Sequence, residues 1–237
     1  MQPMKTILIT GASKGIGRAL AEKLAGNNYR LILTARSAEQ LNAIAEKLRK
    51  KGETVAAFPV DARDDEAVEK LMENVYQEFG AVEVLVNNAG LGIFNRVEDF
   101  ADEDWYKVME TNVKSMLSFT KRVVPEMKKQ QRGHIITVES DVAVRGEPQL
   151  GLYASSKFAQ EGFTRSIRKE LRPFGIRVSN VYPGVTDTDF HPDTPENRNR
   201  EGWLQPEDIA GAIAYIISTP EHVVVDALTI HPKVQDY

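Results

Sequence analysis

The sequence of 237 residues contains no cysteine, and its four histidines are scattered without the spacing of ligands on one helix. These absences exclude disulfides, thiolate chemistry and cysteine metal sites, and they predict no metal site. Long apolar runs are also missing: none approaches the roughly 20 residues that span a bilayer, and the N-terminal run is too short for a signal peptide. We therefore expect a cytoplasmic protein with no membrane partner.

An excess of basic residues is lacking as well. The 34 acidic residues outnumber the 30 Lys and Arg, which gives a formal net charge of -4. Proteins that bind nucleic acids usually carry a net basic surface or stripe. The two basic clusters, at residues 47–51 and 128–129, fall near the ends of predicted helices, where cations favour the helix dipole. We therefore expect no nucleic-acid partner.

What the chain does contain is an alternation of apolar, β-branched runs with segments of helical periodicity. Such alternation indicates right-handed βαβ units and a parallel sheet, and no linker interrupts it, so we expect one doubly wound α/β domain over residues 1–237. The predicted strands are 6–10, 30–34, 54–60, 82–86, 134–138, 176–181 and 227–230. The predicted helices are 16–25, 38–51, 64–79, 102–129 with Pro125 kinking its last turns, 151–172 and 206–218.

One segment, residues 187–203, breaks this alternation. It contains Pro192, Pro195 and Gly202 among many polar residues and has no clear period. An irregular connection of this length inside a compact domain is often a functional lid. A disordered surface loop is the alternative.

A glycine-rich turn joins the first predicted strand to the first predicted helix. Its spacing is Gly11-x-x-x-Gly15-x-Gly17, and no Gly-Lys-Ser/Thr follows, so it is not a P-loop. Glycines let the backbone approach a ligand closely, and the helix N-terminus favours a negative pyrophosphate. The turn therefore favours a dinucleotide site over a plain structural turn.

The end of the second predicted strand indicates which dinucleotide is preferred. Proteins that prefer NAD usually carry Asp or Glu there for the ribose hydroxyls. This chain has Arg36, whose guanidinium suits the 2′-phosphate of NADP, and Lys14 in the glycine turn would add a second positive charge. The alternative is a surface Arg beside a surface Lys, but the missing carboxylate favours NADP(H).

Further polar residues follow the third and fourth predicted strands, at the carboxyl edge where ligands bind in such sheets. Asp61 lies where the adenine is expected, although it or Asp64 could cap the next helix. Asn87-Asn88-Ala89-Gly90 follows the fourth strand, and paired asparagines also form plain turns.

Together with residues further along, these motifs resemble the short-chain dehydrogenase/reductase family, from about Thr6 to the C-terminus. The resemblance implies a Rossmann fold with sheet order 3-2-1-4-5-6-7, and homodimers or homotetramers formed through two long central helices. Lys14 and Arg36 resemble its NADP-preferring branch. The motifs that stand in the family's order and spacing are Thr10-Gly11-x-x-x-Gly15-x-Gly17, Asn87-Asn88-Ala89-Gly90, Asn112, Ser140, Tyr153-x-x-x-Lys157 and Pro183-Gly184.

The resemblance also implies a hydride-transfer site. Tyr153 resembles the general acid/base, Lys157 its activator, Ser140 the hydroxyl that positions the carbonyl, and Asn112 part of a proton relay. An unperturbed tyrosine titrates near roughly pH 10, and a nearby ammonium together with the positive nicotinamide would lower that pKa. The implied cofactor contacts are Gly11, Ser13, Lys14, Gly15, Ile16, Gly17, Arg36, Asp61, Ala62, Asn88, Ala89, Gly90, Tyr153, Lys157, Pro183, Gly184, Val185 and Thr188.

Some residues depart from the family's pattern. Glu139 stands where many relatives have Ser, and adjacent strand residues point to opposite faces, so it can avoid the substrate. If it does not, its carboxylate would disfavour anionic substrates and raise the Tyr153 pKa. Arg145 and Glu147 add charges near the expected pocket mouth. Residues 229–235 lack the Asp-Gly-Gly ending of acyl-carrier-protein reductases and are more similar to the branch of 3-hydroxy acid and serine dehydrogenases.

The sequence therefore predicts an NADP(H)-dependent oxidoreductase that interconverts a small-molecule carbonyl and a secondary alcohol. One alternative is reduction of a 3-oxoacyl thioester on an acyl-carrier protein, which would need a basic docking patch. A second is a non-catalytic nucleotide-sensing protein, although the chain keeps Ser, Tyr and Lys. A partly apolar substrate pocket, or else core and lid packing, is expected from Phe94, Val142, Leu150, Val185, Phe190 and Trp203.

Overall fold

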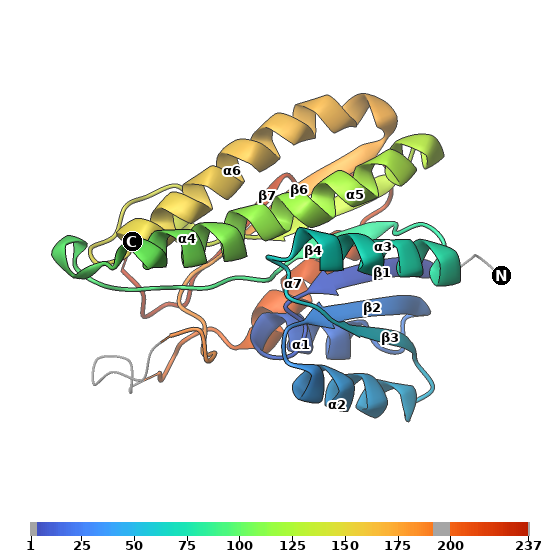
Figure 1. The fold of residues 1–237 in the computed structure, drawn as a ribbon, viewed down its shortest axis with the longest axis horizontal. Coiled ribbons are helices and arrows are strands. Elements are labelled where there is room, and N and C mark those ends of the chain that lie inside the picture. Colours follow the sequence, from blue (N-terminus) through green and yellow to red (C-terminus); the bar gives the residue numbers. More distant parts are fainter. Residues whose placement is uncertain (1–3, 192–199, 237) are drawn as a thin grey trace.

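The computed structural model describes residues 4–191 and 200–236, which form a parallel sheet with helices on both faces (Figure 1). Its seven strands lie in the order β3-β2-β1-β4-β5-β6-β7, so the predicted doubly wound fold is confirmed. The central strands are buried on both faces, which is why their sequences are continuous apolar runs. The strands are β1 Lys5–Thr10, β2 Tyr29–Ala35, β3 Thr54–Pro59, β4 Val84–Asn87, β5 Gly133–Val138, β6 Ile176–Pro183 and β7 Ala227–Ile230.

Two hydrophobic cores cover the two faces of the sheet. Helices α1 (Gly15–Leu24), α2 (Ala38–Arg49) and α7 (Pro206–Ser218) pack on one face. Helices α3 (Asp65–Phe79), α5 (Ser115–Gln130) and α6 (Gly151–Leu171) pack on the other, and Figure 1 shows α5 and α6 side by side there. In the described part of the chain, no helix is both long enough and apolar enough to cross a membrane.

The predicted helix over 102–129 is present, with one irregular turn inside it. Helix α4 (Asp102–Met109) is separated from α5 by a π-helical turn, Glu110–Lys114. Side-chain bonds compete with the regular backbone ladder here, because Asn112 bonds the backbone of Leu91 and Ser115 donates to the Thr111 carbonyl. Pro125 lies inside α5, which continues to Gln130. Pro125 predicted an irregularity in the last turns, whereas the irregular turn lies earlier in the chain, at the predicted catalytic Asn112.

The start of α3 decides which aspartate is a helix cap. Asp64 Oδ1 accepts hydrogen bonds from the backbone N–H groups of Glu66 and Ala67, at 3.1 and 3.0 Å. Asp64 is therefore the N-cap of α3. Asp61, which follows β3, is not the cap.

Candidate active site

A cleft of about 1460 Å³ runs along the carboxyl edge of the sheet. It exceeds the roughly 300–1,000 Å³ of pockets for drug-sized ligands, as a site for a dinucleotide and a substrate would. The predicted cofactor residues line this cleft, except Gly17, which is buried beneath the turn. The predicted catalytic residues Ser140, Tyr153 and Lys157 line it as well, whereas Asn112 is fully buried behind it.

The glycine turn is closely packed against the segment after β4. Gly11 has a φ of +65°, and a Cβ there would lie 2.9 Å from the Ala89 Cα. A Cβ on Gly17 would collide with the Gly11 carbonyl oxygen. The Asn88 side chain donates to the carbonyls of Thr10 and Gly11, at 3.0 and 3.2 Å. These residues hold a bare backbone cradle at the N-terminus of α1, which fits a pyrophosphate.

Cationic side chains lie at the adenosine end of the cleft. Arg36 is exposed, and no ion pair is found for it within residues 4–191 and 200–236. Arg63 pairs with Asp61 at 2.6 Å, and its hydrogen bonds hold the pKa of Asp61 below the usual value. Lys14 lies 3.7 Å from Asp189, both side chains being exposed. Arg36 and Lys14 both line the cleft, and Asp189 partly offsets the charge of Lys14.

Tyr153 is buried at the opposite end of the cleft, in an apolar surround. The rings of Phe94 and Phe190 lie 5.8 and 5.3 Å from its ring. Burial raises the pKa of Tyr153 above its ordinary value; a hydrogen bond with Ser140 opposes this rise, and the charges of Asp141 and Glu139 add to it. In the protein alone, burial outweighs the hydrogen bond with Ser140 and the Tyr153 pKa is raised; the lowering expected with a bound nicotinamide stays a prediction.

Lys157 lies one helical turn after Tyr153 and is 3% exposed. Its Nζ donates to the Val138 carbonyl at 3.0 Å and to Gln160 Oε1 at 2.8 Å, and it lies 5.7 Å from the centre of the Tyr153 ring. Burial lowers the pKa of Lys157, and the negative charge of Glu139 raises it. The ammonium is therefore fixed beside the phenol by neutral acceptors.

Asn112 is connected to Lys157 through Gln160. The Asn112 side chain bonds the backbone N–H and carbonyl of Leu91, and it donates to Ser156 Oγ at 2.8 Å. The backbone carbonyl of Asn112 accepts a hydrogen bond from Gln160 Nε2 at 2.6 Å. The predicted relay role of Asn112 remains a prediction, and the Gln160 amide fills the space between its backbone and the lysine.

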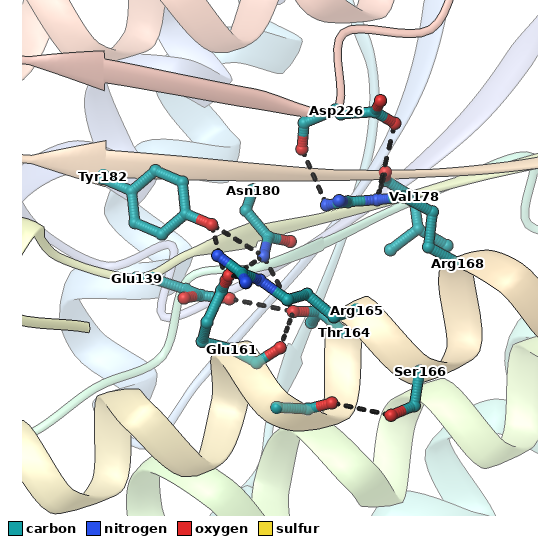
Figure 2. A network of polar contacts seen from close by, with 11 residues as sticks. Glu139, Glu161, Thr164, Arg165, Ser166, Arg168, Val178, Asn180, Tyr182 and Asp226 are labelled. Atoms are coloured by element: carbon teal, nitrogen blue, oxygen red, sulfur yellow. Dashed lines mark hydrogen bonds and ion pairs between the residues drawn. The ribbon is translucent and has the colours of Figure 1, made fainter. Parts of the chain in front are cut away.

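Glu139 is buried beside α6 and β6, as Figure 2 shows. Its Oε1 accepts from the Thr164 hydroxyl at 3.2 Å. Burial raises the pKa of Glu139, and the nearby Glu161 raises it further. Glu139 also raises the pKa of Tyr153, which is the like-charge effect expected from the sequence.

The apolar residues predicted for the substrate pocket divide into two groups. Phe94, Leu150 and Phe190 pack with Val142 around Tyr153 and line the cleft, as Val185 does. Trp203 is outside the cleft lining, and its ring lies 5.1 Å from that of His191.

The described ends of the 187–203 segment are tied together. Arg200 donates to Asp187 Oδ1 at 2.7 Å and to the Thr188 carbonyl at 3.1 Å. A Cβ on Gly15 would lie 3.4 Å from the Thr188 methyl, so the segment contacts the glycine turn. Residues 192–199, with Pro192 and Pro195, lie outside the described residues, and the lid remains a prediction.

Three functional candidates were not found from the sequence: Asp141, Gln160 and Gln235. Asp141 accepts from Ser140, from Arg145 and from Gln235, and Gln235 in turn accepts from the Val185 N–H at 2.9 Å. Gln160 follows Lys157 by three positions on a helix, a spacing that could have revealed it. Gln235 is 94 positions from Asp141 and gives no local signal.

Comparison with known proteins now decides the family. The model described as short chain dehydrogenase matches residues 5–199. The chain belongs to the short-chain dehydrogenase family. An uncharacterized oxidoreductase of Staphylococcus saprophyticus is 34% identical over 229 residues, which cover 96% of this chain and 97% of that protein.

Solved structures of this family are similar over almost the whole chain. An alcohol dehydrogenase from the archaeon Thermococcus sibiricus, complexed with 5-hydroxy-NADP, is 34% identical with a TM-score of 0.92, and 99% of each chain is covered. A closed form of serine dehydrogenase complexed with NADP+ is 26% identical with a TM-score of 0.90, covering 98% of this chain and 96% of that one. These short-chain dehydrogenases hold NADP or an analogue, in agreement with the predicted cofactor class.

Proposed function

We propose that this chain is an NADP(H)-dependent oxidoreductase that reduces a small carbonyl compound to a secondary alcohol and can run in reverse. The observation that carries the proposal is one continuous cleft with a glycine cradle and Arg36 at one end and Tyr153 with Lys157 at the other. The NADP found in similar structures supports the choice of cofactor. Cytoplasmic location and a homodimer or homotetramer stay predictions from the sequence.

The residues of the cleft have separate tasks in this proposal. The backbone of Gly11 and Gly15 would hold the pyrophosphate, Arg36 and Lys14 the 2′-phosphate, and the loop after β6 the nicotinamide. When bound, NADPH supplies a hydride to the carbonyl carbon.

Proton transfer falls to Tyr153. Its phenol is protonated at neutral pH, because its pKa lies above the ordinary value of roughly 10, so it can act as the acid that protonates the substrate oxygen. The Lys157 ammonium, fixed by Val138 and Gln160, then stabilises the phenolate that remains. Ser140 is placed to donate a hydrogen bond to the negative charge that develops on that oxygen.

The charges near Tyr153 favour a free, uncharged substrate. Asp141 raises the Tyr153 pKa, so it places negative potential at the reacting end. Arg145, the cation at this mouth, is paired with Asp141 and Glu147. A thioester substrate on a carrier protein needs a basic docking patch, so it is less well supported. A non-catalytic sensor is also less well supported, because it would have no use for the assembled Ser140, Tyr153 and Lys157.

The decisive experiment is the Tyr153→Phe variant, assayed by loss of NADPH absorbance with a panel of aldehydes and ketones. Removing the proton donor should lower kcat about 100-fold or more, while NADPH binding is retained. Binding is measured by the change in NADPH fluorescence. Turnover equal to that of the unmodified protein would refute the proposed mechanism.

A further inference from the structure

The segment that follows β7 returns to the reacting end of the cleft. The Gly184 N–H donates to the Ile230 carbonyl at 2.8 Å, which holds the end of β7 beside the loop after β6. Residues 231–236 come next, and two of them, Gln235 and Asp236, line the cleft. A segment outside the predicted cofactor and catalytic motifs therefore forms part of the cleft wall.

Gln235 joins two sides of the cleft through its side-chain amide. Its Oε1 accepts from the Val185 N–H at 2.9 Å, and its Nε2 donates to Asp141 Oδ2 at 2.7 Å. Val185 lies in the loop proposed to hold the nicotinamide, and Asp141 is the residue next to Ser140. An uncharged amide offers an acceptor and a donor at the same reach, which is what this bridge uses.

Gly184 leaves the space that the Gln235 amide fills. A Cβ on Gly184 would collide with Gln235 Oε1 and would lie 2.9 Å from His231 Cδ2. The φ of Gly184 is not positive, so its backbone conformation does not require glycine. The close approach of the Gln235 side chain requires it instead. The loop after β6 is therefore shaped to accept this amide.

Asp141, at the other end of the bridge, is 6% exposed and holds the proposed active-site hydroxyl. Its Oδ1 accepts from the Ser140 hydroxyl at 3.1 Å. Its Oδ2 accepts from Arg145 and from Gln235, both at 2.7 Å, and His231 Nε2 lies 3.5 Å from the same oxygen. Donors on Oδ2 fix the plane of the carboxylate, and this plane sets where Oδ1 holds the hydroxyl.

We propose that Gln235 is a positioning residue that keeps the loop after β6 and the Ser140 hydroxyl in a fixed mutual arrangement. The proposal rests on the proposed reductase function and extends it. Through Val185 the amide fixes the loop, and through Asp141 it fixes the orientation of Ser140. The loop and the hydroxyl must serve the same substrate carbonyl, so a small displacement of either one slows the reaction.

The first test is Gln235→Glu, which keeps an acceptor for the Val185 N–H but places a carboxyl group where the donor to Asp141 was. When ionised, this carboxyl group repels the Asp141 carboxylate; when protonated, its O–H can donate to Asp141 Oδ2 as the amide does. Burial and the like charge of Asp141 raise the pKa of such a group toward neutral pH. The charged or titratable groups around Asp141 that the variant shares with the unmodified protein include Arg145, Glu147, Tyr153, His231 and Asp236.

The kcat of Gln235→Glu is divided by that of the unmodified protein at the same pH, which removes the effect of the shared groups. We expect this ratio to be near one at about pH 6 and to fall about tenfold by about pH 8, with KM for NADPH changed by less than about twofold. Gln130→Glu, at the exposed end of α5, is the matched control and should show no such fall. A merely structural role of Gln235 would lower the ratio equally at both pH values.

The second test is Gln235→Met, which keeps the length of the side chain and removes both hydrogen bonds. We expect kcat to fall about tenfold at every pH, and KM for NADPH to rise about fivefold because the Val185 N–H loses its acceptor. Lys233→Met, which changes an exposed side chain of the same segment, is the matched control. If Gln235→Met fails to fold, as judged by circular dichroism, the pH dependence of the isosteric Gln235→Glu decides.

NADPH binding, measured by fluorescence, gives a readout without turnover. The Kd should rise about fivefold in Gln235→Met and stay within about twofold of the unmodified value in Gln235→Glu. Equal kcat ratios at both pH values in Gln235→Glu, or an unchanged Kd in Gln235→Met, would overturn the positioning role. If Tyr153→Phe abolishes turnover in the same assays, the reductase proposal stands even though the positioning role fails; if Tyr153→Phe keeps full turnover, the reductase proposal itself fails.

Discussion

Ser140 illustrates, at the scale of one residue, how the hydroxyl of the proposed active site is held in the protein alone. Its Oγ donates to Asp141 Oδ1 at 3.1 Å and accepts from the Val142 N–H at 3.4 Å. To donate to a substrate oxygen, Ser140 must give up a hydrogen bond to a charged group, worth about 1.5–3 kcal/mol. A developing alkoxide competes for that proton better than a neutral carbonyl does, so the arrangement favours the transition state over the bound substrate.

Arg36 carries the prediction of cofactor preference. Replacing it in Arg36→Ala should lower kcat/KM for NADPH about 10- to 100-fold, the loss of one hydrogen-bonded charge pair, and leave kcat/KM for NADH unchanged. Steady-state rates with both cofactors measure this. Arg18→Ala, which removes an exposed cation paired with Glu22 on α1, is the control. Equal losses with NADPH and NADH would contradict the role given to Arg36.

At the scale of elements, two irregular turns place the site. The glycine turn leads β1 into α1, and the π-helical turn between α4 and α5 brings the Asn112 carbonyl to Gln160. Both turns depart from regular backbone geometry, because contacts with other segments replace the regular backbone hydrogen bonds. A regular helix through Asn112 would lose the present pairing with Leu91.

Gly17→Ala tests how tightly the glycine turn packs around Gly17. The added Cβ meets the Gly11 carbonyl, so we expect a loss of about 1–3 kcal/mol in the free energy of unfolding and weaker NADPH binding. Gly211→Ala is the matched control, because a Cβ there meets nothing within 4 Å and a helix-interior alanine should gain about 0.5–1 kcal/mol. Urea unfolding and NADPH titration measure both. A stability unchanged by Gly17→Ala would show that the turn can relax.

At the scale of the whole molecule, the sheet carries a buried histidine in its central layer. His134 on β5 is 1% exposed, and its Nε2 lies 2.8 Å from the Ser179 hydroxyl on β6. Burial, with the charges of Arg177 and Lys5, lowers the pKa of His134 from 6.5 to about 3. The folded protein therefore keeps this imidazole neutral where the unfolded chain would protonate it.

This depressed pKa predicts sensitivity of the fold to acid. Between the unfolded pKa of 6.5 and the folded pKa of about 3, the unfolded state binds the extra proton. The free energy of unfolding should therefore fall as pH drops through this window, by up to about 1.4 kcal/mol per pH unit. His134→Gln should reduce the difference in the free energy of unfolding between pH 6.5 and pH 4.5. Urea unfolding across that range measures it, and parallel curves for the two proteins would contradict the assignment.

The sequence by itself determined the elements and most of the cleft. Strand runs, helix periods and the glycine turn are local features, set by side-chain alternation and backbone freedom. The residues predicted from them, Gly11, Arg36, Ser140, Tyr153 and Lys157, all line one cleft. The helix through Asn112 is present, but its π-helical turn was not predicted, because the bond between Asn112 and Leu91 spans 21 positions and leaves no local signal.

Only the tertiary structure decided what surrounds Lys157 and Tyr153. Glu139 meets Thr164 across 25 positions, and Gln235 meets Asp141 across 94. Contacts across such separations leave no periodic signal, because packing of the sheet against α6 and the C-terminal segment creates them. For the same reason the effect of burial on the Tyr153 pKa could not be deduced from the motif, because a spacing of residues does not contain burial.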